Sequence, residues 1–484
     1  MIKCQACALT LTLALSGCIS VGPNYVRPRV ETPPAFKEAE GWKLAQPNDA
    51  AARGNWWDVY NDPVLDKLVK QVQVSNQNVI LAEAQYRQAL ALVSGARANY
   101  FPQITANASS TRSQNALTAQ VAGAGTQTQP GTTQTVPAQT NTSDRVSLSL
   151  AWEIDVWGRI RRTVESNQAA AVASQSDLAN ALLSAQAMLV QSYLQLRAID
   201  TDLDLYERSI VSYERALKIT QNRYDAGVAQ RTDVTQAQAQ LESARAAGLD
   251  LAVTRATLEH AVAVLVGRPP ADVIIERTNT LPMVPETPVT VPASLLERRP
   301  DIAAAERRAA SANALIGVAR AAYFPDLTLT GTGGYQSQRF SDLFNVPHRF
   351  WSLGPQLAQT LFDAGAIHSQ VKQNMAAYDA SVASYRETVL TAFQDVEDNL
   401  ATLKLLAQES VAEAAAASAA EQTLAITQNQ YEAGTVDYLN VAIAQQTALS
   451  AERTLRDLNS RRLTASVGLL KALGGGWQTL DLTH

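Results

Sequence analysis

The longest regular pattern in the chain is a seam of apolar positions, spaced alternately by four and three residues, that runs from Leu178 to Tyr224. The seam lies within residues 159–226, a stretch that contains neither glycine nor proline. At 1.5 Å per residue, a helix of this length would extend for about 100 Å. A seam sustained over several heptads predicts a long helix that packs against a partner with a left-handed supercoil.

Residues 366–433 form a second stretch of equal length without glycine or proline. Its seam is weaker, because polar residues such as Asn399 and Glu413 interrupt it. Each stretch ends in a Tyr-x-x-Gly motif, at Gly227 and Gly434. Glycine can adopt the left-handed conformation that ends a helix.

A return helix is predicted after each of these turns, over residues 231–266 and 438–473. Each half of the chain therefore ends in a helical hairpin. A soluble or fibrous coiled coil would also satisfy this pattern, so the helices alone do not define the class of protein.

The segment before each long helix has a strictly alternating pattern. From Val146 to Val156, apolar side chains occupy one face and mostly polar side chains the other. The alternation recurs at residues 327–330 and 351–361 and, weakly, at 104–106, with aromatic residues at the segment ends. Strands of about ten residues with one apolar face and aromatic girdles are typical of outer-membrane barrels. The alternative is a soluble antiparallel sheet with one face in water.

Four strands cannot close a barrel, because the smallest barrels have about eight. A dimer would supply eight strands and a trimer twelve. Eight strands enclose an interior that side chains fill, so an open lumen requires the trimer. The predicted fold is a mixed α and β membrane protein in which three chains share a 12-stranded β-barrel, four strands per chain, continued by long helices.

The same pattern is present twice. Arg97–Pro102 recurs 223 residues later, and Thr220–Gly227 recurs 207 residues later. The difference between the two offsets must lie in the intervening segment. Residues 113–143, rich in Gln, Thr, Gly and Pro, are therefore expected to form a long loop in the first copy. A shorter loop near residues 336–349 is expected in the second copy.

The N-terminus has the pattern of a lipoprotein signal. Lys3 precedes the short apolar stretch Ala8–Leu15, and Leu15-Ser16-Gly17-Cys18 follows. This looks like a bacterial lipobox, which predicts a signal peptide over residues 1–17 and lipidation of Cys18. Ile19 after the cysteine favours the outer membrane. The alternative is an ordinary signal with a chance cysteine. One lipid chain anchors only marginally, so a second membrane element is also expected.

Composition narrows the function. Charged residues make up 18% of the chain, below the roughly 25% of soluble domains. The net charge of −5, without a Lys/Arg block, argues against nucleic acid as a partner. The four histidines lack metal-ligand spacing, and no nucleophile elbow or phosphate loop occurs. We predict no metal, no cofactor and no enzymatic activity, and we expect carboxylates on the long helices to form solvated faces.

Several motifs agree in order and spacing with one known family. They are Val21–Pro28 (VGPNYVRP), Asn55–Leu65 (NWWDVYNDPVL), Arg298–Ile302 (RRPDI) and the paired Tyr-Phe-Pro and Tyr-x-x-Gly motifs. From Cys18 to about Gly474, the chain resembles the outer-membrane efflux lipoproteins of the TolC-like, NodT type.

The resemblance implies a homotrimer whose barrel opens to the exterior and continues into a periplasmic α-helical barrel. It implies the exit duct of a tripartite exporter, set in outer-membrane lipid and docked to a periplasmic membrane-fusion adaptor and an inner-membrane pump, with the resistance-nodulation-division type favoured. The expected organisation is a lipidated extended segment (18–62), a first repeat (63–267, strand pair 102–156), a Pro-rich equatorial segment (268–300), a second repeat (301–474, strand pair 325–362) and a tail (475–484).

In that family the periplasmic end holds a gate built at the two helix-to-helix turns. The resemblance places gate residues at Asp233, Tyr431, Leu439, Asn440 and Ile443. It places helix-turn and adaptor contacts at Arg223, Tyr224, Gly227, Arg231, Gly434, Asp437 and Tyr438. Family members often carry acidic rings at the positions of Asn440 and Ile443, and this chain lacks them. We hypothesise that Leu439 and Ile443 close the gate by apolar packing with tyrosine contacts; the alternative is that these residues only pack helix against helix.

Three functions remain open. The first is an export duct for small toxic compounds such as drugs, dyes and organic acids. The second is a duct for metal ions or secreted polypeptides, and the third is a structural lipoprotein that bridges the periplasm without conducting. The amphipathic strands argue against the third. The scarcity of methionine after the signal peptide argues weakly against a duct for soft metal ions.

Overall fold

The computed structural model describes residues 20–39, 55–114, 118–120, 134–136, 140–285 and 299–475. The predicted signal peptide, Cys18 and nearly all of the C-terminal tail lie outside the described residues. The chain divides into two compact units. The first draws on Met1–Val26, Leu90–Ala170 and Ala310–Ala380, and the second on Arg27–Ala89, Ala171–Ala309 and Ser381–His484.

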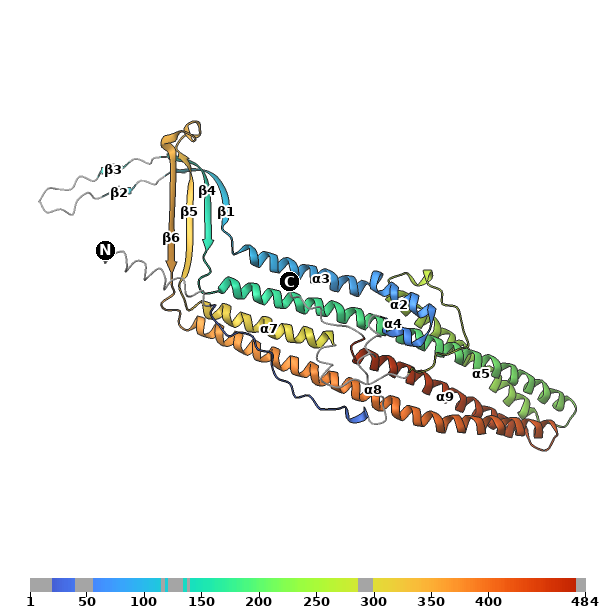
Figure 1. Ribbon diagram of the computed structural model, residues 1–484. Helices are drawn as coiled ribbons and strands as arrows, with labels where there is room; N and C mark the ends of the chain where they lie inside the picture. The colour runs from blue at the N-terminus through green and yellow to red at the C-terminus, as the bar shows by residue number, and fades with distance from the viewer. Residues whose placement is uncertain are drawn as a thin grey trace. The chain divides into compact units, whose positions relative to one another are not determined.

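The first unit contains a four-stranded antiparallel sheet (Figure 1). Its strands are β1 (Gln103–Gln114), β4 (Thr140–Glu153), β5 (Asp326–Ser337) and β6 (Arg349–Ala358), in the order β1-β4-β5-β6. Each repeat supplies two neighbouring strands, so the prediction of four strands per chain is confirmed.

One face of this sheet is apolar across the strands. Leu150 of β4 and Leu353 of β6 stand on either side of Gly331 of β5. A Cβ atom at Gly331 would lie 3.1 Å from Cδ1 of Leu353, so the glycine makes room for the neighbouring leucine. On the same face, Leu148 is 58% exposed and Trp351 is 74% exposed. The alternating pattern therefore produces a continuous apolar face that the described part of the chain leaves uncovered.

The expectation of a long loop over residues 113–143 needs correction, whereas the shorter loop expected near residues 336–349 lies between β5 and β6. Strand β1 continues to Gln114 and strand β4 already begins at Thr140, and a short antiparallel pair, β2 (Thr118–Gln120) and β3 (Gln134–Val136), lies between them. Threonine and valine at the C-terminal end of this segment favour extended backbone, which is consistent with the pairing of β2 and β3. In the second copy, the connection between β5 and β6 contains two short 3-10 helices, η5 (Phe340–Asp342) and η6 (Val346–His348).

The helices repeat in length. The bounds are α2 (Pro63–Ser75), α3 (Gln77–Ala98), α4 (Arg159–Asp225), α5 (Arg231–Leu265), α7 (Pro300–Ala321), α8 (Ala366–Glu432) and α9 (Tyr438–Ala472). Helices α4 and α8 have 67 residues each, α5 and α9 have 35 each, and α3 and α7 have 22 each. The internal repeat is therefore confirmed, and each stretch without glycine and proline is one helix. Over the described residues, none of the helices combines the length and apolar character that crossing a bilayer requires.

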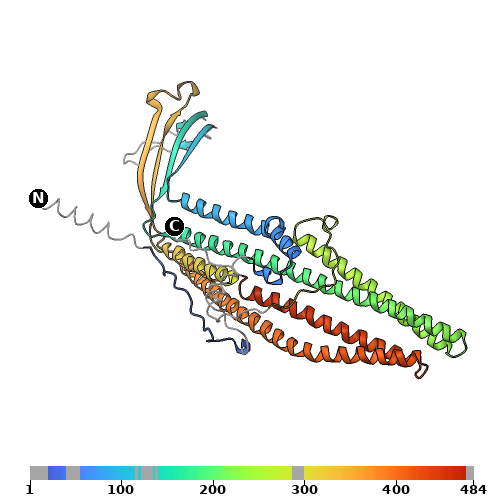
Figure 2. The ribbon, with the colours of Figure 1, turned by 45° about the vertical axis from the view of Figure 1, so that its right-hand side comes forward.

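In the second unit, α4 with α5 and α8 with α9 form two antiparallel hairpins that lie side by side (Figure 1, Figure 2). Its largest core forms where α2 and the short helix η3 (Trp56–Tyr60) pack on α4. Asp62 starts α2, because its carboxylate accepts hydrogen bonds from the backbone N–H groups of Val64 (2.8 Å) and Leu65 (3.1 Å). The same carboxylate accepts the hydroxyl of Tyr193 on α4 at 2.6 Å, which fixes α2 to the long helix.

A buried ionic cluster attaches the Pro-rich segment to the first hairpin. The Asp200 side chain is fully buried between Arg255 (Nε to Oδ1, 2.6 Å) and Arg197 (Nη1 to Oδ2, 3.2 Å). Both guanidinium groups also donate at 2.6 Å to backbone carbonyls of the segment, Arg255 to Ile275 and Arg197 to Glu276. The expectation that helix carboxylates form solvated faces is wrong here. An irregular segment packed on helices needs donors for its carbonyl groups, and the two arginines provide them.

We expect Asp200→Asn to lower the free energy of unfolding by about 3 kcal/mol, because it leaves the buried guanidinium group of Arg197 without a counter-charge and leaves Arg255 paired with Glu259 alone (3.3 Å). Asp204→Asn is the matched control, since Asp204 pairs with Arg208 at 3.2 Å on the exposed side of the same helix. An exposed pair contributes less than about 1 kcal/mol. The midpoint of thermal unfolding, followed by circular dichroism, measures both changes. Equal shifts for the two variants would contradict a structural role for the buried cluster.

Candidate functional site

The two hairpin turns have the same backbone construction. Gly227 (φ +76°) and Gly434 (φ +80°) both adopt the left-handed conformation. In the first turn the N–H of Val228 donates to the carbonyl of Arg223 at 2.9 Å, and in the second the N–H of Thr435 donates to the carbonyl of Gln430 at 2.9 Å. These bonds satisfy carbonyl groups at the helix ends, as in a Schellman cap. The two glycines thus end the helices.

The turn regions of the two hairpins pack on one another through a small apolar cluster. Ala216 of α4 and Ala237 of α5 are buried together with Tyr431, Val441 and Ala442 of the second hairpin. Small side chains on the first hairpin allow the larger ones on the second to approach closely. The first hairpin therefore presents a flat surface of small side chains, and the larger side chains of the second hairpin project onto it.

Tyr431 makes two polar contacts between the hairpins near their turns. Its hydroxyl lies 3.0 Å from Oγ1 of Thr220, and both groups are buried. The guanidinium group of Arg223 lies over the Tyr431 ring, 4.7 Å from its centroid, and donates a hydrogen bond to the Tyr431 backbone carbonyl. One side chain of the second hairpin is thus held by a hydroxyl and by a cation of the first.

Tyr438 completes the cluster. Its ring meets that of Tyr431 edge to face, with centroids 5.7 Å apart and an angle of 65° between the planes. The side chain is 1% exposed, and its hydroxyl is buried without a hydrogen-bond partner among the described residues. Burial, together with the nearby Tyr431, raises the pKa of Tyr438 to about 12. The hydroxyl therefore stays protonated over the physiological pH range.

The residues that the resemblance assigned to the gate occupy different environments. Tyr431 lies in the cluster between the hairpins, whereas Leu439 (53% exposed), Asn440 and Ile443 (57% exposed) lie on a face of α9 that the described part of the chain leaves open. Asp233 caps α5, because its carboxylate accepts the N–H of Gln230 at 3.3 Å.

The residues assigned to the helix turns also separate into two groups. Arg223 and Tyr438 are engaged between the hairpins, whereas Tyr224, Arg231 and Asp437 are exposed. The sequence reasoning missed Thr220 as a contact residue. The available signal was its place in the apolar seam, where a hydroxyl needs a partner. Among the residues that the structure describes, no group of histidine, cysteine, aspartate and glutamate side chains could hold a metal ion.

Known proteins are similar to this chain over most of its length. The family model for "Outer membrane efflux protein" matches residues 68–268 and 291–475. The toluene efflux pump outer membrane protein TtgC of Pseudomonas putida is 29% identical over 97% of this chain and 95% of its own length. The outer membrane protein OprJ of Pseudomonas aeruginosa is 31% identical, with the same two shares covered.

Solved structures agree with the sequence matches. The outer-membrane channel OprN superposes with a TM-score of 0.84 at 29% identity, covering 95% of this chain and all of that chain. The open state of the Neisseria gonorrhoeae channel MtrE superposes with a TM-score of 0.80 at 26% identity, covering 94% of this chain and 98% of that chain. The chain therefore belongs to the family of outer membrane efflux proteins, and it is a channel component rather than an enzyme.

Proposed function

We propose that three copies of this chain form the outer-membrane exit channel of a tripartite efflux system and passively conduct small toxic organic compounds to the exterior. The observation that carries the proposal is the four-stranded sheet, which has an exposed apolar face and, within the described residues, two free edges at β1 and β6. In a bilayer, unpaired backbone groups at a sheet edge cost several kcal/mol each. Pairing β6 of one copy with β1 of the next removes both edges, and three copies give twelve strands.

The proposed cargo class rests on the relatives. TtgC is named for the efflux of toluene, which points to small, uncharged organic compounds. The candidate gate combines Tyr431, Leu439 and Ile443 with only one carboxylate, that of Asp233, and no cluster of His, Cys, Asp and Glu side chains among the described residues could hold a metal ion there. A duct for metal ions or polypeptides is the second candidate, because a passive lumen need not bind what passes through it.

The proposed partners are a periplasmic membrane-fusion adaptor and an inner-membrane pump of the resistance-nodulation-division type. The exposed turn residues Tyr224, Val228, Arg231 and Asp437 offer the contact surface for the adaptor. Val228 is 67% exposed, an uncovered apolar side chain at the tip of the first hairpin. A pump is required because a passive channel supplies no energy for transport.

Lipidation of Cys18 is supported by the segment that follows it. The N–H of Val21 donates to the carbonyl of Trp157 at 3.0 Å, and the Trp157 ring stacks on Phe324 with centroids 4.7 Å apart. The segment that follows the predicted lipidation site is thus fixed beside aromatic residues of the unit that contains the sheet, as an anchor in the periplasmic leaflet of the outer membrane would require.

The proposed gate has two layers. Between the hairpins of one chain, Tyr431 and Tyr438 hold the second hairpin against the first. Between chains, the uncovered face of α9 that carries Leu439, Asn440 and Ile443 meets its copies around the trimer axis. Closure by apolar packing would leave no carboxylate to bind a cation there.

We expect deletion of the gene to sensitise the cell to drugs, dyes and apolar solvents, because their exit route is removed. The measurement is a susceptibility panel that also includes metal salts, in a strain without redundant exit channels. Complementation by the intact gene should restore growth. Sensitivity to metal salts alone would contradict the proposed cargo class and favour the second candidate.

We expect Tyr431→Phe to increase the open probability of the channel in planar bilayers about fivefold, because it removes one buried hydrogen bond of about 1 kcal/mol between the hairpins. Thr220→Val should act similarly, and the double variant should add little to either. The control is Arg231→Gln in the exposed part of the first turn, which should leave the open probability unchanged. If the two single variants added fully, the contact between Thr220 and Tyr431 would not act as one unit.

We expect Ile443→Asp to raise the closed-state conductance for cations, because three carboxylates would replace an apolar constriction. The control is Ile443→Leu, which keeps the side chain apolar and should leave the conductance unchanged. Single-channel recordings in potassium chloride measure the effect. An Ile443→Asp channel that conducts as the wild type does would contradict the apolar gate.

A further inference from the structure

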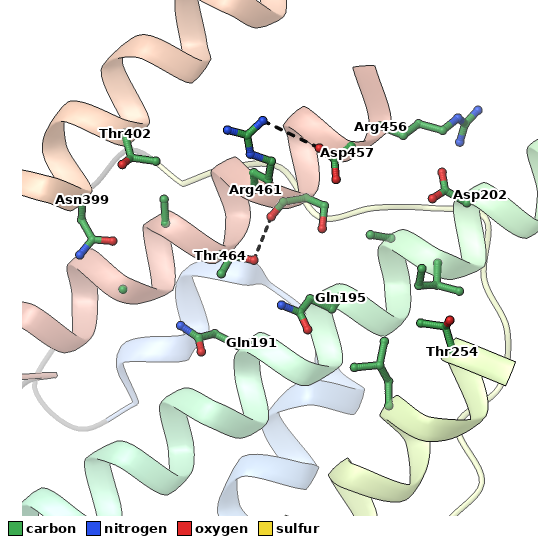
Figure 3. A pocket seen from close by; sticks show the side chains of 16 residues that line it. Gln191, Gln195, Asp202, Thr254, Asn399, Thr402, Arg456, Asp457, Arg461 and Thr464 are labelled. Carbon is green, nitrogen blue, oxygen red and sulfur yellow. Dashed lines mark hydrogen bonds and ion pairs between the residues drawn. The ribbon is translucent and has the colours of Figure 1, made fainter. Parts of the chain in front are cut away.

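A cavity of about 620 Å³ lies within the second unit, away from the hairpin turns (Figure 3). Helices α4, α5, α8 and α9 all contribute to its lining. Its volume falls within the range of roughly 300–1,000 Å³ that is usual for sites of small organic ligands. None of the residues that the gate proposal uses lines it.

The cavity forms where the two repeats face one another. With the offset of 207 residues, Gln195 corresponds to Thr402 and Leu258 to Ala465, and all four line the cavity. The wall therefore combines aliphatic side chains with uncharged polar ones. Such a mixture of apolar surface and a few polar groups is typical of ligand sites.

Most charged groups of the lining already have partners. Asp457 pairs with Arg461 at 3.9 Å, and Arg456 donates to the backbone carbonyl of Thr201 at 3.1 Å and pairs with Glu452 at 3.7 Å. These contacts pair the charged groups of α9 along the helix itself and, through Arg456, with the backbone of α4. The remaining charged group of the lining is the acidic side chain that α4 contributes.

That group is Asp202. Its Oδ1 atom is buried and has no hydrogen-bond partner among the described residues. Burial raises the pKa of the Asp202 carboxyl to about 6, with Asp457 acting in the same direction and with Arg456 and Arg453 of α9 opposing it. The lining residues from α5 and α8 are uncharged. At neutral pH a mostly ionised, incompletely satisfied carboxylate therefore faces a cavity of ligand size.

We propose that this cavity binds a small organic cation, with the positive charge against Asp202 and the apolar body against Ile199, Leu258 and Ala465. The side-chain amides of Gln191, Gln195 and Asn399 provide further hydrogen-bonding groups around it. A bare divalent metal ion fits less well, because it would require several oxygen ligands with more than one free carboxylate. Binding in this cavity does not depend on conduction, so the loss of one can be separated from the loss of the other.

The test uses the assembled, detergent-solubilised channel and two aromatic probes that share a ring system. Ethidium is a permanent cation, and phenanthridine is neutral at pH 7.5. Fluorescence titration should give saturable ethidium binding to the wild type, weakened at least about tenfold by Asp202→Asn. Phenanthridine should bind weakly and respond little to the substitution. The matched control is Asp250→Asn, which removes an exposed carboxylate of α5 outside the cavity.

The pH dependence provides an independent measurement. Protonation neutralises Asp202, so ethidium binding to the wild type should weaken as the pH falls through about 6, whereas binding to Asp202→Asn should remain flat. Thermal unfolding confirms that the variants are folded. The proposal is overturned if ethidium does not bind, if Asp202→Asn binds it as the wild type does, or if phenanthridine binds equally tightly.

Discussion

The free edges of the four-stranded sheet are the constraint on which the rest of the molecule depends. Strands β1 and β6 each have one side without a partner among the described strands, and the face between them is apolar. Lipid accommodates the apolar face, but it does not tolerate the free edges unless their backbone groups pair. A single chain with these four strands therefore encloses no lumen. The proposed gate can close a channel only when several copies surround a common axis. The outer-membrane location of the family is consistent with this requirement.

The internal repeat gives two hairpins of the same backbone construction, but equivalent side chains of the two hairpins lie in different environments. Tyr224 and Tyr431 occupy equivalent positions before their turn glycines, but Tyr224 is 39% exposed and Tyr431 only 4%. Tyr431 is buried because Thr220 and Arg223 of the first hairpin contact it. The second hairpin has Thr427 and Gln430 at the positions of Thr220 and Arg223, so it lacks the arginine. The two hairpins are equal in length, but their side chains differ. The larger side chains of the second hairpin pack on small side chains of the first.

Local patterns predicted the elements well, and long-range contacts much less so. The absence of glycine and proline over 159–226 and the alternation near Leu148 depend on the chain alone, so the long helix and the strand followed from them. Asp200 looked like one more solvated helix carboxylate, because its partner Arg255 is 55 residues away and the carbonyls it helps to hold lie further still. The sequence shows Thr220 only as a polar residue in an apolar seam, and it does not reveal that the partner of its hydroxyl is Tyr431.

Other segments of the chain hold the two hairpins at different distances from their turns. The cluster at Asp200 holds α4 on the first hairpin. On α8 the polar contacts to the N-terminal segment that lie nearest the turn are at Glu397, whose carboxylate accepts the N–H groups of Lys37 (2.7 Å) and Glu38 (2.9 Å). From these points to Gly227 and Gly434, the second hairpin extends about ten residues further, or about 15 Å of helix. A rod bends more easily as its unsupported length grows, but the second hairpin is supported again at its tip, because Thr220 and Arg223 of the first hairpin contact Tyr431. A load on the second tip is therefore passed through these contacts to the first hairpin, which is held over the shorter span.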